Sequence, residues 1–395
     1  MLEIRDSALE RRIVRELDAL REGAQFRSLE RLDRTVAVNF CSNDYLGLSH
    51  DARLREAVLK AVVSAEAVGS TGSRLLSGNS RQWEEIESEF ACFAGTETAL
   101  YFGSGYAANV GLLSSFLKPG DTVFSDALNH ASVIDGIRLS GAEKIIYPHC
   151  DLEFLERVLH DRHADRSSAR VIVTESVFSM EGDIAPIKAL LELARKSGAE
   201  LVIDEAHATG VYGPQGRGIV ADLGVEREML AIVHTCGKAL ASAGAFVCGR
   251  SALKNYLINR ARTFIFSTAM PPYLAGQIHA ALALARAAES ERAHLHHIAL
   301  ALREELAAAG LNSGASVTHI VPVIVGSNES ALHLARGLRR SGFAVKAIRP
   351  PTVPPDTARL RFSLTSKITL DDTHRLAAAA RKFLPQSTFT TVAHD

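Results

Sequence analysis

Short apolar runs recur along the central part of this chain, and stretches with helical patterning separate several of them. A run that is apolar along its whole length indicates a strand buried on both faces, which occurs when helices cover both sides of a mostly parallel sheet. This alternation constrains the fold more than any other feature, and it predicts an α/β architecture. The expected strands are Thr98–Phe102, Thr122–Ser125, Lys144–Tyr147, Val171–Thr174, Leu201–Asp204, Met229–Thr235 and Ala245–Cys248.

The pattern changes near Ser290, where a long helix rich in alanine, leucine and histidine leads into a second, smaller α/β region. We therefore expect a large domain over residues 49–289, a small C-terminal domain over 290–395, and an N-terminal arm over 1–48 that packs on the small domain. The arm contains an amphipathic helix, Leu9–Leu20, and a short strand, Thr35–Phe40. In the small domain we expect strands at His319–Val325, Ala344–Ile348 and Arg359–Leu364, and helices at Ser330–Arg340 and Asp371–Phe383.

Composition excludes several classes of protein. The formal net charge is −1, which gives no support for a nucleic-acid or membrane-surface partner. The 5 cysteines are scattered without a C-x-x-C pair, so a zinc site or disulfide framework is not expected, and a reducing cytoplasm fits. The charged N-terminus lacks the apolar core of a signal peptide, and no run is long and apolar enough to span a bilayer.

One lysine lies among unusually small neighbours, in the run His234-Thr235-Cys236-Gly237-Lys238-Ala239-Leu240-Ala241-Ser242-Ala243-Gly244. The run follows a predicted buried strand. Small neighbours leave room for a large planar ligand, and a buried lysine can lose its proton and become a nucleophile. We interpret Lys238 as the residue that forms a Schiff base with pyridoxal phosphate, with Thr235 offering a hydroxyl to the phosphate.

A cofactor of this kind needs an acid beside its pyridine nitrogen. Asp204 ends a predicted apolar strand, and the carboxyl ends of strands are where ligands bind in open α/β sheets. His207 follows three residues later, where it could donate a hydrogen bond to the ring oxygen. The alternatives are a helix-capping acid or a metal ligand, but no third ligand is spaced to complete a zinc site with Asp204 and His207.

Three further polar residues follow predicted strands or turns. His130 could stack on the pyridine ring and contact a substrate carboxylate, although a lone histidine is usually structural. Ser179 offers a hydroxyl at the edge of the sheet, or is an ordinary turn serine. Asn43 lies in a polar turn and could either contact a ligand or simply form that turn.

The segment Gly103–Ala108 matches the pattern G-x-G-x-x-A between a strand and a helix. This pattern is the dinucleotide fingerprint, so a nicotinamide-dependent oxidoreductase is an alternative. It would leave Lys238 unexplained, and it expects the fingerprint at the first strand of its domain. The same backbone can instead hold one phosphate at a helix N-terminus, with Gly105 and Tyr106 close to the cofactor.

Arg359 and Arg361 share one face of a predicted strand. A buried arginine beside an amino-acid site would bind the α-carboxylate through two hydrogen bonds, and Arg361 is our candidate. The alternative is a solvated strand face.

Together these motifs resemble the α-oxoamine synthases, fold-type I pyridoxal phosphate enzymes that condense an amino acid with an acyl thioester. The resemblance covers nearly the whole chain. It rests on residues 42–48, Gly105-Tyr106-Ala107-Ala108-Asn109, Asn129-His130-Ala131-Ser132, Val177-Phe178-Ser179-Met180, Asp204-Glu205-Ala206-His207, Thr235-Cys236-Gly237-Lys238, residues 267–272 and the proline-rich stretch 348–354. It implies a mostly parallel seven-stranded sheet in the large domain and a homodimer with shared active sites.

The resemblance also implies roles for individual residues. Lys238 carries the cofactor and removes the α-proton, Asp204 pairs with the pyridine nitrogen, and His130 stacks on the ring. His207 and Ser179 contact the ring oxygen, while Gly105, Tyr106 and Thr235 surround the phosphate. Thr268 reaches the phosphate of the neighbouring subunit's cofactor, and the substrate contacts fall to Arg361, Asn43, His130, Arg21 and Thr352.

The implied reaction is the decarboxylative condensation of L-alanine with a pimeloyl thioester, carried on coenzyme A or on acyl carrier protein. A related synthase that uses glycine or serine with another acyl-CoA is the nearest alternative. A catalytically inactive scaffold is a third, and the complete set Lys238, Asp204, His130 and Arg361 speaks against it. Cys236 stands where a larger apolar residue is expected, and Ala239–Ser242 is less glycine-rich than usual for the family; both departures bear on substrate identity more than on chemistry.

Overall fold

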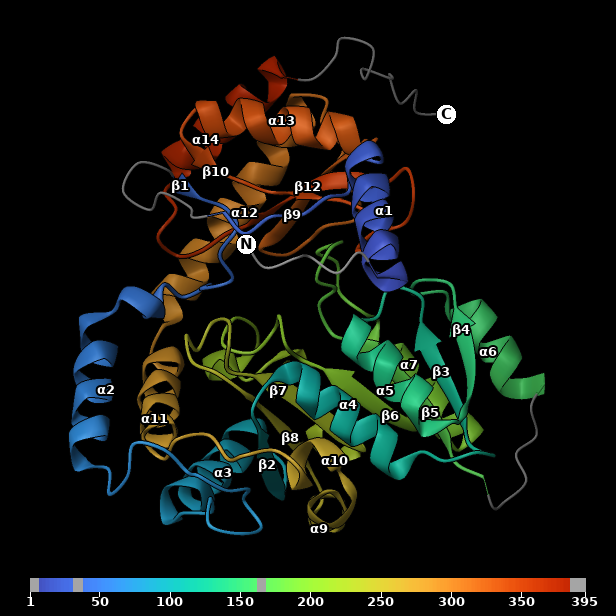
Figure 1. The fold of residues 1–395 in the computed structure, drawn as a ribbon, viewed down its shortest axis with the longest axis vertical. Helices are drawn as coiled ribbons and strands as arrows, with labels where there is room; N and C mark the ends of the chain where they lie inside the picture. Colours follow the sequence, from blue (N-terminus) through green and yellow to red (C-terminus); the bar gives the residue numbers. More distant parts are fainter. Residues whose placement is uncertain (1–6, 31–37, 162–167, 384–395) are drawn as a thin grey trace.

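A seven-stranded sheet dominates the computed structural model of the protein, which describes residues 7–30, 38–161 and 168–383 (Figure 1). The strand order is β2-β8-β7-β6-β5-β3-β4. Neighbours from β4 to β7 pair in parallel, whereas β8 is antiparallel to both β2 and β7. The strands are β2 (Thr98–Phe102), β3 (Thr122–Asp126), β4 (Glu143–Tyr147), β5 (Arg170–Glu175), β6 (Glu200–Asp204), β7 (Ala231–Thr235) and β8 (Ala245–Gly249). The predicted mostly parallel seven-stranded sheet is confirmed.

Both faces of this sheet are buried, as the unbroken apolar runs predict. Alternate residues of a strand point to opposite faces, so Val171 and Val173 pack into one core while Ile172 packs into the other. The helices around the sheet are α2 (Ala52–Ser64), α3 (Arg81–Ala94), α4 (Gly105–Phe116), α5 (Ala131–Ser140), α6 (Leu152–Asp161), α7 (Ile187–Ser197), α8 (Ile219–Asp222), α9 (Ser251–Arg260), α10 (Arg262–Ile265) and α11 (Tyr273–Arg286).

A smaller three-stranded antiparallel sheet, in the order β11-β12-β9, lies in the upper lobe of Figure 1. Its strands are β9 (Ile320–Gly326), β11 (Ala347–Ile348) and β12 (Ala358–Ser363). The long helix α12 (Glu289–Ala308) runs from the lower lobe into the upper one, where α13 (Asn328–Arg340) and α14 (Leu370–Lys382) cover the small sheet (Figure 1). The domain boundaries given above stay a prediction.

The single strand predicted over Ala344–Ile348 is wrong. It is two short strands with different partners: β10 (Phe343–Ala344) pairs in parallel with β1 (Val38–Asn39), whereas β11 pairs with β12. The change of partner within five residues breaks the strand. Of the strand predicted over 35–40, residues 35–37 lie outside the described part of the chain.

The N-terminal helix α1 (Ala8–Glu22) forms where the amphipathic pattern over Leu9–Leu20 predicts it, with Ser7 as its N-cap. None of its residues is buried within the single chain, so its apolar stripe is open. The segment after the helix makes the contacts with the upper lobe: Arg349 donates to the carbonyls of Ala24 and Phe26. Among the described residues, no helix has the length and apolar character needed to cross a membrane.

Candidate active site

A cavity of about 540 Å³ opens at the carboxyl ends of the parallel strands. It gathers residues from the large sheet, from the turn at residue 43 and from β12 of the small sheet. Ten of the residues singled out from the sequence line it: Asn43, Gly105, Tyr106, His130, Ser179, Asp204, His207, Thr235, Lys238 and Arg361. Residues separated by more than three hundred positions in the chain therefore meet in one pocket.

Lys238 lies in the loop that joins β7 to β8. Hydrogen bonds from Cys236 N to Gly244 O and from Ser242 N to Cys236 O close this loop tightly. Gly244 has φ +85° and a Cβ there would overlap the ring of Tyr101, so glycine is required at that turn. The Lys238 amine donates one long hydrogen bond, 3.4 Å, to Thr235 Oγ1. Burial lowers the pKa of Lys238, which favours the nucleophilic amine, although the nearby acidic residues Asp204 and Glu175 oppose that shift.

Asp204 is fixed as a hydrogen-bond acceptor at the end of β6. Its Oδ2 accepts from Asn109 Nδ2 at 2.7 Å, and its Oδ1 accepts from the backbone N–H of Ala206 at 2.8 Å. Two donors stabilise the charged form of a buried carboxylate. Asp204 therefore presents a negative charge at the floor of the pocket, as a partner for a protonated ring nitrogen.

A hydrogen-bond relay connects Asp204 to His130. Asn109 also donates to Ser132 Oγ at 2.9 Å, and Ser132 Oγ lies 2.7 Å from His130 Nδ1. The backbone N–H of Ser132 donates to the same nitrogen, so Nδ1 is the acceptor and the proton resides on Nε2. Burial lowers the pKa of His130 despite the nearby Asp204 charge. The ring is therefore neutral and suited to stacking on a flat ligand.

His207 is buried and neutral, since burial and the charge of Lys238 lower its pKa well below the ordinary range. Its Nδ1 lies 2.6 Å from the hydroxyl of Tyr45, a fully buried tyrosine. Arg361 Nη2 in turn lies 3.5 Å from that hydroxyl. The tyrosine thus links the histidine to the arginine, a connection that the sequence alone does not reveal.

Arg361 reaches the pocket from β12 of the upper lobe. Its Nε donates to the carbonyl of Ser179, and its Nη1 donates to Asn43 Oδ1 at 3.0 Å. Arg359, on the same face, is buried and pairs with Glu181 at 2.9 Å. The solvated-face alternative for these arginines is wrong. Because Arg359 is committed to an ion pair and Arg361 is not, Arg361 is the one able to bind an incoming carboxylate.

Gly105 is the first residue of α4, and Ser104 caps the helix by accepting from Ala107 N. A Cβ at Gly105 would lie 2.8 Å from Thr235 Cγ2, so these two residues can approach only because one is glycine. The free N–H groups of the helix end and the Thr235 hydroxyl suit a phosphate. Tyr106 is 47% exposed and its hydroxyl is bonded to Asp135.

Three predicted residues do not line this cavity. Thr268 lies in a bridge with Ser73 and lines a neighbouring cavity together with Gly103 and Ser104. Arg21 pairs with Asp18 on the exposed side of α1. Thr352 is exposed and accepts a hydrogen bond from Arg27 at 3.3 Å.

Four residues at the site went unassigned in the sequence analysis: Asn109, Ser132, Tyr45 and Glu175. Asn109 lies one helical turn after Gly105, so i, i+4 spacing from the glycine loop could have indicated it. Glu175 ends β5 as Asp204 ends β6, and strand-end position was the signal that found Asp204. Tyr45 lies in the motif over residues 42–48, but nothing in its spacing indicates the hydrogen bond to His207.

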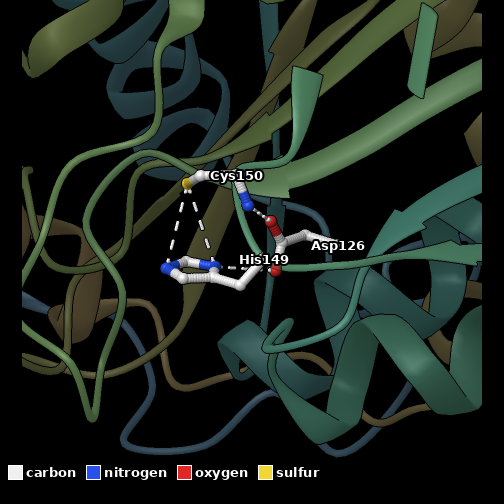
Figure 2. Close-up of side chains that lie close together, drawn as sticks. All are labelled: Asp126, His149 and Cys150. Carbon is white, nitrogen blue, oxygen red and sulfur yellow. Dashed lines mark hydrogen bonds and ion pairs between the residues drawn. The ribbon is translucent and has the colours of Figure 1, made fainter. Parts of the chain in front are cut away.

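A second polar cluster, Asp126, His149 and Cys150, lies near the end of β3 (Figure 2). His149 Nδ1 is 3.0 Å from Asp126 Oδ1, and Nε2 is 2.7 Å from Asp183 Oδ2. Cys150 Sγ is 3.8 Å from both ring nitrogens and so lies along neither lone pair. Burial opposes charge on the ring, but the two carboxylates prevail and raise the pKa of His149 to about 12. We interpret the cluster as a charged clamp between β3 and the loop of Ser179, because both ring nitrogens already lie against carboxylates. A metal centre is the alternative, since the ligand atoms of the three residues lie within 4.8 Å of one another.

Comparison with known proteins identifies relatives of the chain as a whole. The family model for aminotransferase class I and II matches residues 35–379. A putative 8-amino-7-oxononanoate synthase of Geobacillus kaustophilus is 44% identical over 88% of this chain and 91% of its own length. The 8-amino-7-oxononanoate synthase of Azoarcus sp. is 45% identical over 88% of each chain.

Solved structures agree in fold. A serine palmitoyltransferase of Sphingomonas wittichii superposes with a TM-score of 0.86 at 27% identity, covering 95% of this chain and 97% of its own. The 8-amino-7-oxononanoate synthase of Francisella tularensis superposes with a TM-score of 0.76 at 30% identity, covering 88% and 97%. A further structure, SPT with the internal aldimine of PLP, has a TM-score of 0.87 at 28% identity and covers 95% and 98%.

Proposed function

Since this chain belongs to the aminotransferase class I and II family, and within it to the α-oxoamine synthases, we propose that it is a pyridoxal phosphate-dependent acyltransferase of biotin biosynthesis. It condenses L-alanine with a pimeloyl thioester and forms 8-amino-7-oxononanoate, CO2 and the free thiol carrier. The observation that carries this proposal is identity of 43–45% over about nine tenths of the chain to synthases of that name. The pocket contains groups suited to that chemistry.

The residues present fit pyridoxal phosphate. Lys238 offers an amine with one weak hydrogen bond, and Asp204 offers a carboxylate held by two donors. The close approach of Gly105 to Thr235, which a Cβ would prevent, leaves a helix N-terminus open for the phosphate. Bound there, the cofactor supplies an electron sink for the charge that develops at the amino acid's Cα.

The chain's own groups then divide the remaining work. Arg361 and Asn43, which are hydrogen-bonded to each other, would hold the α-carboxylate of L-alanine. Lys238 Nζ, whose pKa burial lowers, would take the proton from Cα and later return it. Asp204 would keep the ring nitrogen of the bound cofactor charged. His130 would lie against the ring face, and His207 and Ser179 would contact the ring oxygen.

We further infer a homodimer, because Thr268 lies outside this cavity although the family resemblance assigns it to a phosphate. In a shared active site Thr268 would contact the phosphate of the partner's cofactor.

We propose that Arg21 and Thr352 contact the acyl chain, and that Arg21 reaches it by movement of the arm. All 5 cysteines are free thiols, which suits a cytoplasmic location. The division into an arm, 1–48, and two domains, 49–289 and 290–395, is part of the same proposal.

A substrate panel tests the function. Purified holoenzyme is supplied with L-alanine, glycine or L-serine and with pimeloyl-CoA, pimeloyl-acyl carrier protein or palmitoyl-CoA. Thiol release and product mass are measured. We expect the product of L-alanine and a pimeloyl thioester to dominate. L-serine with palmitoyl-CoA is the second candidate, favoured by the higher TM-scores to serine palmitoyltransferases, and its dominance would replace our assignment.

A further inference from the structure

Glu175 is the group at the pocket that no role above uses. It is the last residue of β5, and in the parallel pairing of β5 with β6 it stands in register with Asp204. Residues 171 and 173 of β5 and residue 202 of β6 pack into the same core, so Glu175 and Asp204 continue on that same face. Glu175 lines the cavity and is 2% exposed. Two carboxyl groups thus lie side by side at the pocket floor.

These two carboxyl groups differ in the hydrogen bonds that they accept. Asp204 accepts from a side-chain amide and from a backbone N–H. The backbone N–H of His130 lies close enough to the Glu175 carboxyl group to oppose the rise in its pKa, while Glu175 Oε1 is buried with no hydrogen-bond partner. An ionised carboxylate with an unpaired buried oxygen is costly, and a second negative charge beside it raises that cost. This unequal hydrogen bonding favours a proton on Glu175 over one on Asp204.

The surrounding charges support this division. Burial and then Asp204 raise the pKa of Glu175 well above its ordinary range, and Glu181 adds to the shift. Lys238 and the His130 N–H act in the opposite direction. By contrast, the equally buried Glu205 has three donors, Ser176 Oγ and the N–H groups of Ile219 and Val220. Burial raises its pKa only to about 7.

We propose that Glu175 is a neutral carboxylic acid in the working enzyme, a positioning residue that seats His130 and keeps the pocket floor at one negative charge. This rests on the proposed function. The neutral group has two consequences. His130 keeps the place from which it contacts the cofactor ring, and Lys238 experiences one anionic neighbour rather than two, so its amine loses its proton more readily.

The test uses holoenzyme variants E175Q and E175D. Glutamine keeps the shape and neutrality of a protonated glutamate, so we expect turnover with the best substrate pair within about threefold of wild type. The side chain of E175D is shorter and remains ionisable, so it withdraws from the segment that carries His130, and we expect roughly a hundredfold loss of turnover. Glu153→Gln, on the exposed side of α6, is the matched control and should change nothing.

Infrared difference spectra give a readout besides activity. The wild-type spectrum minus that of E175Q should contain the carbonyl stretch of a protonated carboxylic acid near neutral pH, and the Glu153→Gln control should not remove it. Absence of that band, or loss of activity in E175Q with retention in E175D, would overturn the inference. A wild-type enzyme that shows the band but makes no oxoamine product would instead refute the proposed function alone.

Discussion

Two regions of this molecule each combine a histidine with carboxylates at strand ends, yet they differ in one respect. At His149 both ring nitrogens already lie within hydrogen-bonding distance of carboxylates, and the pKa is raised to about 12. At His130 one nitrogen is bonded to Ser132, and among the described residues Nε2 has no hydrogen bond to protein. Its pKa is lowered by burial.

This difference in hydrogen bonding distinguishes a cluster that stabilises the fold from a pocket that can bind a ligand. A polar group whose hydrogen bonds are all made within the protein stabilises the fold and has nothing left for a ligand. The pocket floor keeps unused hydrogen-bonding capacity at Lys238, His130 and Arg361, which is where a cofactor and substrate would find partners. Substitutions in the two regions should therefore change different quantities.

Lys238→Ala should give the largest effect. It removes both the cofactor's attachment and the base for the α-proton, and we expect a loss of turnover of at least about 10⁴-fold. Thiol release measures the loss and circular dichroism confirms the fold. Lys196→Ala, at the exposed end of α7, is the control. Normal turnover in Lys238→Ala would place the chemistry elsewhere.

The substitutions Asp204→Asn and Asp126→Asn compare the two regions directly. The first removes the charge that faces the ring nitrogen, and we expect kcat to fall roughly 10²- to 10³-fold with little change in stability. The second weakens the clamp on His149 and should lower the free energy of unfolding while kcat changes little. Denaturant titration and steady-state kinetics on both variants measure this. If both variants changed kcat and the free energy of unfolding in the same way, the two regions would not differ in function as we claim.

His149→Asn tests the charge on the clamp. Removing a charged ring held between two carboxylates should cost about 3 kcal/mol of unfolding free energy near neutral or lower pH. A raised pKa stabilises the folded state fully below the ordinary value of 6.5, and that contribution is lost as the pH rises toward about 12. The stability difference between wild type and variant should therefore be smaller at about pH 9 than at about pH 6. A difference that grows with pH would contradict a charged His149.

Cys150→Ser should give the smallest effect, below about 0.5 kcal/mol. The sulfur lies along neither lone pair of His149, so little depends on it. The variant also tests the metal alternative. Stoichiometric zinc binding by the wild type, measured by calorimetry and lost in Cys150→Ser, would show that the cluster is a metal centre after all.

Much of the fold and of the candidate site could be predicted from the sequence, because strand periodicity and strand-end position are local properties. The seven strands of the large sheet and the meeting of Asp204 with Lys238 follow from them. The relay from Asp204 through Asn109 and Ser132 to His130 could not be predicted, because it joins a strand and two helices through side-chain geometry. The split at Ala344–Ile348 was also hidden, because pairing partners are a tertiary choice.

The central claim is that the Lys238 pocket joins an amino acid to an acyl group with loss of the amino acid's carboxyl carbon. The most direct measurement supplies the holoenzyme with pimeloyl-CoA and L-alanine that is isotopically labelled at its carboxyl carbon, and follows labelled CO2 and free thiol together. We predict that one labelled CO2 is released for each thiol, and that the product carries no label. Thiol release without labelled CO2, or label retained in the product, would contradict the account.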